Sequence, residues 1–216
     1  MKVFSGFTTE TAKSLVLDAG AFFKNFNVEN DTFETAKAAG KLLGATKDGG
    51  EFSAVPAIRQ IEVDGIKGRA KGLEVIDSWD VYIKANVLEV KKDTLKAALC
   101  ASEVDEQASE THDVITAKNS IELDDYIDNI TWVGTLSGSD KPVIIQVFNA
   151  INTDGLKITT KDKDQAVVAM TFYGHYTQED LNTPPFKILY PKSASENTEG
   201  DNTEGESGED GDAGTV

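Results

Sequence analysis

The chain of 216 residues is poor in the residue types from which catalytic and metal sites are built. It has one cysteine, Cys100, and two histidines, His112 and His175, one in a polar stretch and one in an aromatic stretch. A lone cysteine is typical of a small buried residue in a reducing compartment. No nucleotide-binding, nucleophile-elbow or zinc-protease motif occurs in the sequence. We therefore expect a protein that is not an enzyme, with no catalytic residues, no metal ligands and no cofactor.

Long apolar runs are also missing. No stretch of the sequence approaches the roughly 18 apolar residues that indicate a membrane-spanning helix. The first ten residues, MKVFSGFTTE, lack the apolar core and the cleavage site of a signal peptide. The sequence therefore predicts a protein that is made and folded in a cytoplasm and that has no membrane partner.

Basic residues are outnumbered, 21 against 37 acidic ones, which gives a net charge of −16. Residues 193–216 hold eight carboxylates and no base, whereas residues 1–192 hold 29 acids against 21 bases. This division predicts a folded domain over 1–192 and an acidic Gly/Glu-rich tail over 193–216, too poor in apolar residues to order itself. The acidic domain argues against direct binding of nucleic acid, because phosphates attract Lys and Arg.

The central feature of the sequence is the stretch from Leu73 to Glu89. Apolar residues occupy most odd positions, and polar residues occupy a second face, namely Glu74, Ser78, Asp80, Lys84 and Asn86. Alternation with a period of two is typical of a β-strand. Seventeen residues would span roughly 56 Å, and ordinary strands stop at about 3–10 residues. The strand is therefore either bulged near Asp77 or unusually long.

The rest of the domain also indicates a mainly β fold. Further strands are predicted over 14–26 (as two arms around an Asp-Ala-Gly turn, with Leu15, Leu17 and Phe23 facing inwards), 52–63, 130–136, 143–150, 156–160, 166–176 and 186–190. Pro56 requires an edge, a bulge or a late start for its strand, and Asp64-Gly65 marks a turn.

Two short segments have helical character. Asp93 offers an N-cap to a short helix with an apolar stripe of Leu95, Ala98 and Leu99. Residues 31–44 read either as a second short helix or as an ordered loop, and residues 102–111 read as a loop.

Two charged clusters invite a functional reading. Lys67, Arg69 and Lys71 alternate through the glycine-rich segment GIKGRAKG. They form either a solvated turn or a basic loop that meets an acidic patch on another copy. Asp124, Asp125 and Asp128 are better interpreted as an acidic turn than as a cation site, because calcium loops need a fuller set of oxygen ligands and a glycine.

Residues 51–90 (EFSAVPAIRQIEVDGIKGRAKGLEVIDSWDVYIKANVLEV) and 125–176 (DYIDNITWVGTLSGSDKPVIIQVFNAINTDGLKITTKDKDQAVVAMTFYGHY) strongly resemble the major tail proteins, or tail tube proteins, of long-tailed phages of Gram-positive bacteria. The resemblance covers most of residues 1–190 and includes no catalytic signature. It implies a β-sandwich-like or barrel-like fold with one short packed helix. It also implies a structural protein of the virion tail that forms hexameric rings, and stacked rings would form the tube through which the genome is ejected.

The same resemblance implies the partners: copies of the chain itself, a tape-measure protein, and tail terminator and baseplate proteins. DNA would pass through the lumen without specific binding. The candidate lumen-lining residues are Glu74, Ser78, Asp80, Lys84 and Asn86. The candidate contacts between rings are Lys67, Arg69 and Lys71, together with the N-terminus.

Two other functions remain open. One is the inner tube of a contractile tail or a related injection system. The other is a monomeric β-sandwich binding module, such as a carbohydrate-binding adhesin, which would expose a cluster of aromatic residues. Trp79 and Trp132 instead fall on apolar strand faces.

Overall fold

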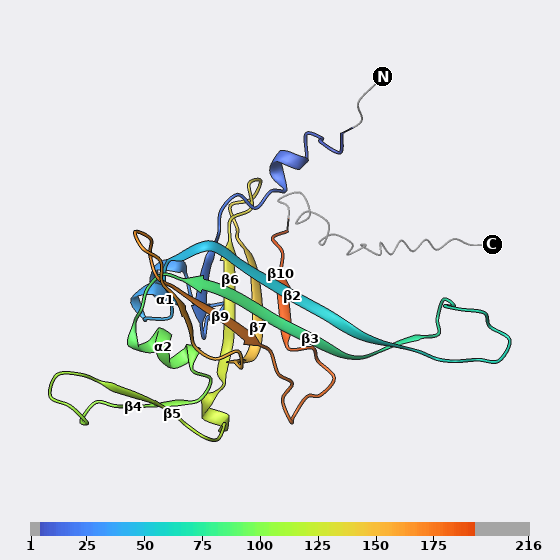
Figure 1. Cartoon of the computed structure of the whole chain (residues 1–216). Coiled ribbons are helices and arrows are strands. Elements are labelled where there is room, and N and C mark those ends of the chain that lie inside the picture. Colours follow the sequence, from blue (N-terminus) through green and yellow to red (C-terminus); the bar gives the residue numbers. More distant parts are fainter. Residues whose placement is uncertain (1–4, 193–216) are drawn as a thin grey trace, which may run out of the picture.

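The computed structural model describes residues 5–192, and the predicted tail over 193–216 lies outside them (Figure 1). The fold is mainly β, as predicted. The strands are β1 (Ala21–Lys24), β2 (Thr46–Gln60), β3 (Glu74–Val87), β4 (Ser102–Asp105), β5 (Val114–Ala117), β6 (Ile127–Gly134), β7 (Val143–Asn152), β8 (Lys157–Thr159), β9 (Val167–Tyr173) and β10 (Phe186–Leu189). The helices are η1 (Thr11–Lys13), α1 (Phe33–Ala38), α2 (Lys92–Ala98) and η2 (Leu123–Asp125).

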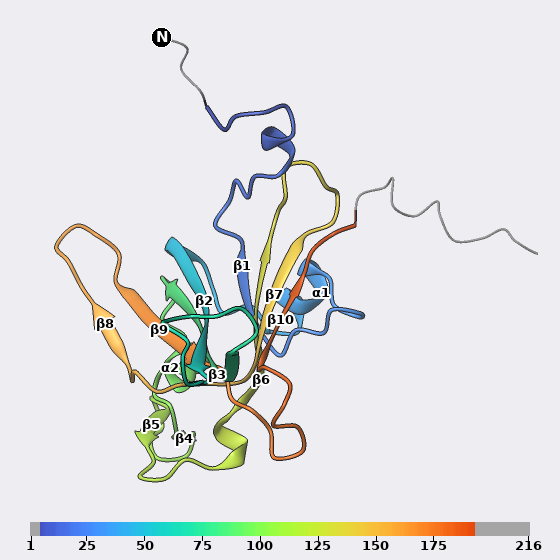
Figure 2. The same cartoon turned by 90° about the vertical axis from the view of Figure 1, so that its right-hand side faces the viewer.

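Eight of the strands form one antiparallel sheet that folds over on itself (Figures 1 and 2). One half contains β1, β6, β7 and β10, and the other contains β2, β3, β9 and β8. β7 joins the halves, because it pairs with β6 along most of its length and then reaches β9 through Ile151 and Asn152. The strands β4 and β5 form a separate two-stranded sheet.

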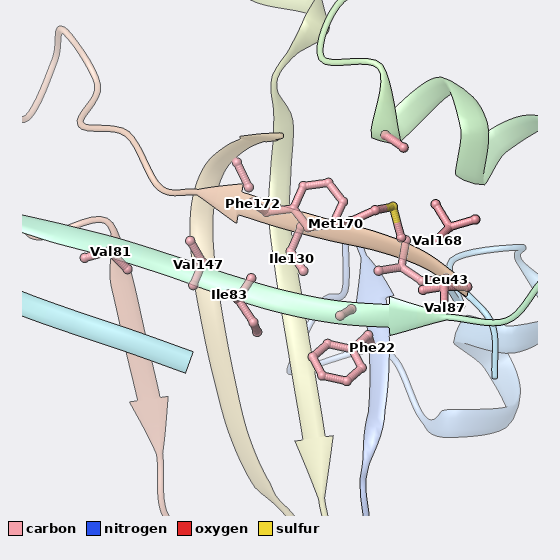
Figure 3. Close-up of a cluster of buried hydrophobic side chains, with 13 residues drawn as sticks. Phe22, Leu43, Val81, Ile83, Val87, Ile130, Val147, Val168, Met170 and Phe172 are labelled. Carbon is pink, nitrogen blue, oxygen red and sulfur yellow. The ribbon is translucent and has the colours of Figure 1, made fainter. Parts of the chain in front are cut away.

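The hydrophobic core lies between the two halves of the sheet (Figure 3). β3 contributes every second residue from Val81 to Val87, and β9 contributes Val168, Met170 and Phe172. They pack against residues of β6 and β7 such as Ile130 and Val147. The predicted period of two is confirmed for the second half of β3, where the odd positions are buried and the even ones are not.

The helix α2 closes one end of this core. Ala98 packs into it, and the buried Asn152 donates a hydrogen bond from Nδ2 to the Ala98 carbonyl at 2.9 Å. The N-cap is Lys91 and not the predicted Asp93, whose carboxylate instead pairs with Lys24 at 3.0 Å. That pair joins α2 to β1.

The prediction for 14–26 is only half right. Phe23 is buried in β1, whereas Leu15 and Leu17 are exposed, Leu17 at 73%. Residues before β1 run along the end of the β6–β7 hairpin, where Leu15 bonds Ser137. Gly20 turns the chain into β1 with a φ of 65°, and a side chain there would collide with the Trp132 indole. The indole nitrogen donates to the Ala19 carbonyl at 2.9 Å.

Of the two alternatives left open for 31–44, the short helix is observed. It is the six residues of α1, capped by Thr32 and Thr35, whose side chains each accept from the other's backbone nitrogen. The predicted loop over 102–111 begins with β4, which pairs with β5. Val104 and Ile115 lie directly opposite each other in this small sheet.

Candidate assembly surface

The long hairpin of β2 and β3 carries most of the predicted site residues. Its pairing runs from Thr46 and Val87 to Gln60 and Glu74. The outer half projects from the body as an arm, with residues 61–73 at its tip (Figure 1). The sequence predicted that this strand is either unusually long or bulged near Asp77. β3 is both, since it has 14 residues and a bulge at Asp77.

The bulge is visible in the pairing register. Ala57 lies opposite Ser78, but the next residue, Ile58, lies opposite Ile76, which leaves Asp77 as the extra residue. Arg59 binds the Asp77 carboxylate through Nε and an Nη, each at 3.0 Å. This bidentate pair raises the pKa of Arg59, first through the hydrogen bonds and then through the attraction of the two charges.

The extra residue exchanges the two faces of the strand beyond it. Because directly opposed residues share a face, Glu74 opposite Gln60 points away from the side that bears Ser78. The prediction that all five candidate lumen residues share one face is therefore wrong for Glu74. In the sequence, even positions hold polar residues on both sides of Asp77, so nothing there marks a change of face. Only the pairing with β2 shows that residues before and after Asp77 exchange faces.

The other four candidates lie on the solvent face of the β2-β3-β9-β8 half-sheet, opposite the core. Ser78 and Asp80 are exposed, and Lys84 and Asn86 are half-buried. Lys84 lies directly opposite Glu51 of β2. This face therefore carries both signs of charge.

Two tyrosines occupy the middle of the same face. The rings of Tyr82 and Tyr173 lie 5.8 Å apart, and the Tyr82 hydroxyl donates to Glu51 at 2.7 Å. The hydrogen bond to Glu51 raises the pKa of Tyr82, and burial followed by Asp154 raises the pKa of Tyr173. Both phenols therefore remain protonated donors at neutral pH.

The arm exposes apolar side chains that no other part of the described chain covers. Val55, Ile58, Val75 and Ile76 are 55%, 57%, 38% and 52% exposed. Ile58 and Ile76 continue the core-facing side of the hairpin past the end of the core. Trp79 marks the boundary, since it is half-buried with its ring centroid 5.5 Å from that of Phe186. Exposed apolar patches of this kind are typical of interaction surfaces.

The half-sheet also has two free edges. Within residues 5–192, β2 pairs only with β3, and β8 pairs only with β9. At the opposite end of the sheet β1 is covered, because residues 41–43 bond its other side. Pro56 lies within β2 without interrupting it, and its place on an edge strand is one of the three options that the sequence allowed.

The candidate contact residues Lys67, Arg69 and Lys71 are all exposed at the tip of the arm. Arg69 has a weak ion pair with Glu74 at 3.7 Å. Gln60 donates to the Gly68 carbonyl at 2.9 Å and shapes the loop. Gly65, with a φ of 88°, occupies the predicted turn.

Comparison of the chain with known protein families and with curated proteins finds no match.

The remaining polar clusters are tied into the fold. Of the three acidic residues near 125, Asp125 is nearly buried and pairs with Lys118 at 2.7 Å, whereas Asp124 and Asp128 are exposed. No group of three metal-ligating side chains gathers between residues 5 and 192. Over the same span, the helices are too short or too polar to cross a membrane.

Sequence reasoning missed an apolar groove of about 860 Å³ lined by β1, α1, β6, β7 and the end of β10. Phe26, Val133, Ile144 and Leu189 form its floor, and the partly exposed Phe33 and Tyr190 lie at its rim. The nearby Asp31 carboxylate accepts from the Asn27 amide and pairs with Lys41 at 2.6 Å, and these contacts lower its pKa. No local sequence signal marks this groove, because its walls come from five separate segments, one of which includes Ile144 of β7.

Proposed function

We propose that this protein is a structural subunit that assembles with copies of itself into rings, and that stacked rings form a phage tail tube. The observation that carries the proposal is the half-sheet with two uncovered edges, β2 and β8. Unpaired edges template the addition of further strands, and natural proteins cover them or close the sheet into a barrel.

The strand directions permit such a closure. The order β2-β3-β9-β8 is antiparallel throughout, so β2 of one copy would meet β8 of the next copy in an antiparallel sense. Repetition of this contact gives a ring with a continuous inner sheet. A hexamer, as the sequence resemblance implies, would line its channel with the solvent face of six half-sheets.

This arrangement assigns the lumen to the face that bears Ser78, Asp80, Lys84 and Asn86. The mixture of acids, amides, hydroxyls and few bases on that face offers DNA little attraction, because phosphate adhesion grows with the number of Lys and Arg contacts. Genome passage without specific binding is consistent with such a lining. The tape-measure, terminator and baseplate partners remain part of the proposal.

The rim of the apolar groove favours a second candidate, a monomeric β-sandwich module that binds a carbohydrate. Phe33 and Tyr190 are 47% and 64% exposed beside the groove, and stacking on aromatic faces is a common mode of sugar recognition. This candidate predicts a protein that remains single and binds through the groove, with the β2 and β8 edges free.

Amide hydrogen exchange, read by mass spectrometry on dilute and on concentrated samples, tests the proposal. Assembly is expected to slow exchange in β2 and β8 together. The internal control is β10, which has no role in the proposed contact between copies and should exchange at the same rate in both samples. If exchange in both edge strands is unchanged in the concentrated sample, the ring proposal is wrong.

A further inference from the structure

Two arms leave the body of the molecule on opposite sides (Figure 1). One is the β2–β3 hairpin, which ends in the tip, residues 61–73. The other, which we call the acidic arm, is the two-stranded sheet β4–β5 with its connecting loop, residues 102–117. A contact between one end of a molecule and the other end of its copy is heterologous, and such contacts repeat into rings or filaments.

The acidic arm has five carboxylates and neither Lys nor Arg. Two of them, Glu106 and Asp113, bind Lys92 of α2 at 2.5 and 2.9 Å and hold the arm against the body. The exposed Glu103, Asp105 and Glu110 have no basic partner within residues 5–192.

The outer face of this small sheet bears one apolar side chain, Val114, beside its acids. Asp105 lies opposite Val114 and Glu103 lies opposite Thr116, so the four side chains share one face, and all are exposed. The other face, with Val104 and Ile115, is half-buried. An isolated two-stranded sheet is marginally stable, and a partner on its open face would stabilise it.

The tip has the complementary chemistry. Ile61, Val63 and Ile66 are 40%, 49% and 43% exposed, beside the bases Lys67 and Lys71, which have no acidic partner within the described residues. The tip holds three bases against two acids, Glu62 and Asp64, so its net charge is +1 in a chain whose net charge is −16.

We propose that the tip of one copy docks on the open face of the acidic arm of a second copy, with Lys67 and Lys71 facing Glu103, Asp105 and Glu110 and the tip isoleucines against Val114. The inference rests on the proposed self-assembly and adds the receptor for the arm. Complementary charges at exposed positions contribute chiefly to the specificity and rate of such an encounter.

Paired charge reversals test the contact. Lys67→Glu with Lys71→Glu takes the net charge from −16 to −20, and Glu103→Lys with Glu110→Lys takes it to −12. Each pair alone is expected to raise the protein concentration needed for assembly by at least about fivefold, and the combined variant, at −16, is expected to restore it. Assembly is measured by light scattering and sedimentation, and thermal unfolding verifies that each variant folds.

Two features separate the proposal from a general effect of charge. Net repulsion alone predicts that the Glu103/Glu110 variant, being less negative, assembles better, whereas the docking contact predicts that it assembles worse. The matched control, Lys37→Glu with Lys187→Glu, removes two exposed bases that belong to neither arm, one in α1 and one in β10, and should assemble better than the Lys67/Lys71 variant. Failure of the combined variant to recover, or better assembly of the Glu103/Glu110 variant, overturns the docking contact.

Carbodiimide cross-linking of a mixture of ¹⁴N- and ¹⁵N-labelled wild-type protein gives an independent reading. We expect mixed-isotope links between the peptides that contain Lys67 or Lys71 and those that contain Glu103 or Glu110. Rings or tubes without these links would overturn this inference and leave the proposed function intact. A protein that stays single and forms no mixed-isotope link would overturn both.

Discussion

At the scale of single residues, Phe172 and Ile58 show how the same kind of side chain serves two purposes. Phe172 is fully buried between the two halves of the sheet, whereas Ile58 is 57% exposed on the arm. Both belong to strands of one sheet and both read as apolar strand positions. Only the structure separates the residue that the subunit needs for folding from the one that remains uncovered.

The first prediction contrasts these two residues. Phe172→Ala should lower the free energy of unfolding by roughly 3–5 kcal/mol, because it removes a large buried side chain and leaves a cavity. Ile58→Ser should change it by less than about 0.5 kcal/mol, because the side chain is exposed in the single chain. It should weaken the proposed assembly, in which another copy would cover this side chain. Urea denaturation measures the first effect and light scattering the second. Normal assembly of Ile58→Ser would contradict a role for the arm's apolar face.

A second prediction concerns Asp125, whose contact with the Lys118 ammonium holds the pKa of the carboxyl below its ordinary value. A carboxyl whose pKa is lower in the folded state stabilises the fold above the ordinary carboxyl pKa, and this contribution disappears as the pH falls through the folded value. Asp125→Asn should therefore lower the free energy of unfolding at pH 7 and have a smaller effect at pH 3. Asp124→Asn, which alters an exposed neighbour, is the control. An equal loss at both pH values would contradict the ion pair's role.

At the scale of elements, the sequence predicted strands well where the period of two was unbroken. The second half of β3 has the predicted burial, and β7 and β9 overlap the strands predicted over 143–150 and 166–176. It could not predict the faces across the bulge, because the loss of phase at Asp77 depends on how β3 pairs with β2. It also missed the β4–β5 sheet, since each of these strands has only four residues, too short a pattern to recognise.

For the candidate site too, the sequence predicted what depends on local pattern and missed what depends on strand pairing. The sequence placed Lys67, Arg69 and Lys71 in an exposed loop, and four of the five proposed lumen residues on one face. The free edges of β2 and β8 could not be read from the chain, because whether a strand lies at an edge depends on the order of all the strands in the sheet. For the same reason, the sequence could not predict that the β2–β3 arm and the acidic arm leave the body on opposite sides.

The third prediction tests the independence of the arm from the core. Residues 58–77 can be replaced by Asn-Gly, which would join Ala57 and Ser78, two directly opposed residues, by a two-residue hairpin turn. The shortened chain should fold, because the buried residues of the hairpin begin at Val81, but it should not assemble. Circular dichroism and sedimentation measure the two properties. Tubes formed by the shortened chain would show that the arm is dispensable.

At the scale of the whole molecule, the distribution of charge opposes assembly. Residues 193–216 hold half of the net charge of −16, and like charges brought together in a ring repel one another. The acidic tail would therefore act as a brake on polymerisation at low ionic strength and lose its effect when salt screens it.

The fourth prediction follows from this distribution. A chain ending at Lys192, with a net charge of −8, should polymerise faster than the full chain in low salt and at a similar rate in high salt. Turbidity over a series of salt concentrations measures both rates. Equal rates throughout the series would end the idea of an electrostatic brake.

The central claim is that the β2-β3-β9-β8 half-sheet is completed by copies of the same chain, and the mass of the purified protein in solution tests it most directly. Light scattering at increasing protein concentration, with negative-stain microscopy of the same samples, should give a mass that grows in multiples of the 23.3 kDa subunit and should show rings that stack into tubes. A mass that remains 23.3 kDa at every concentration, with no rings in the images, would contradict the claim.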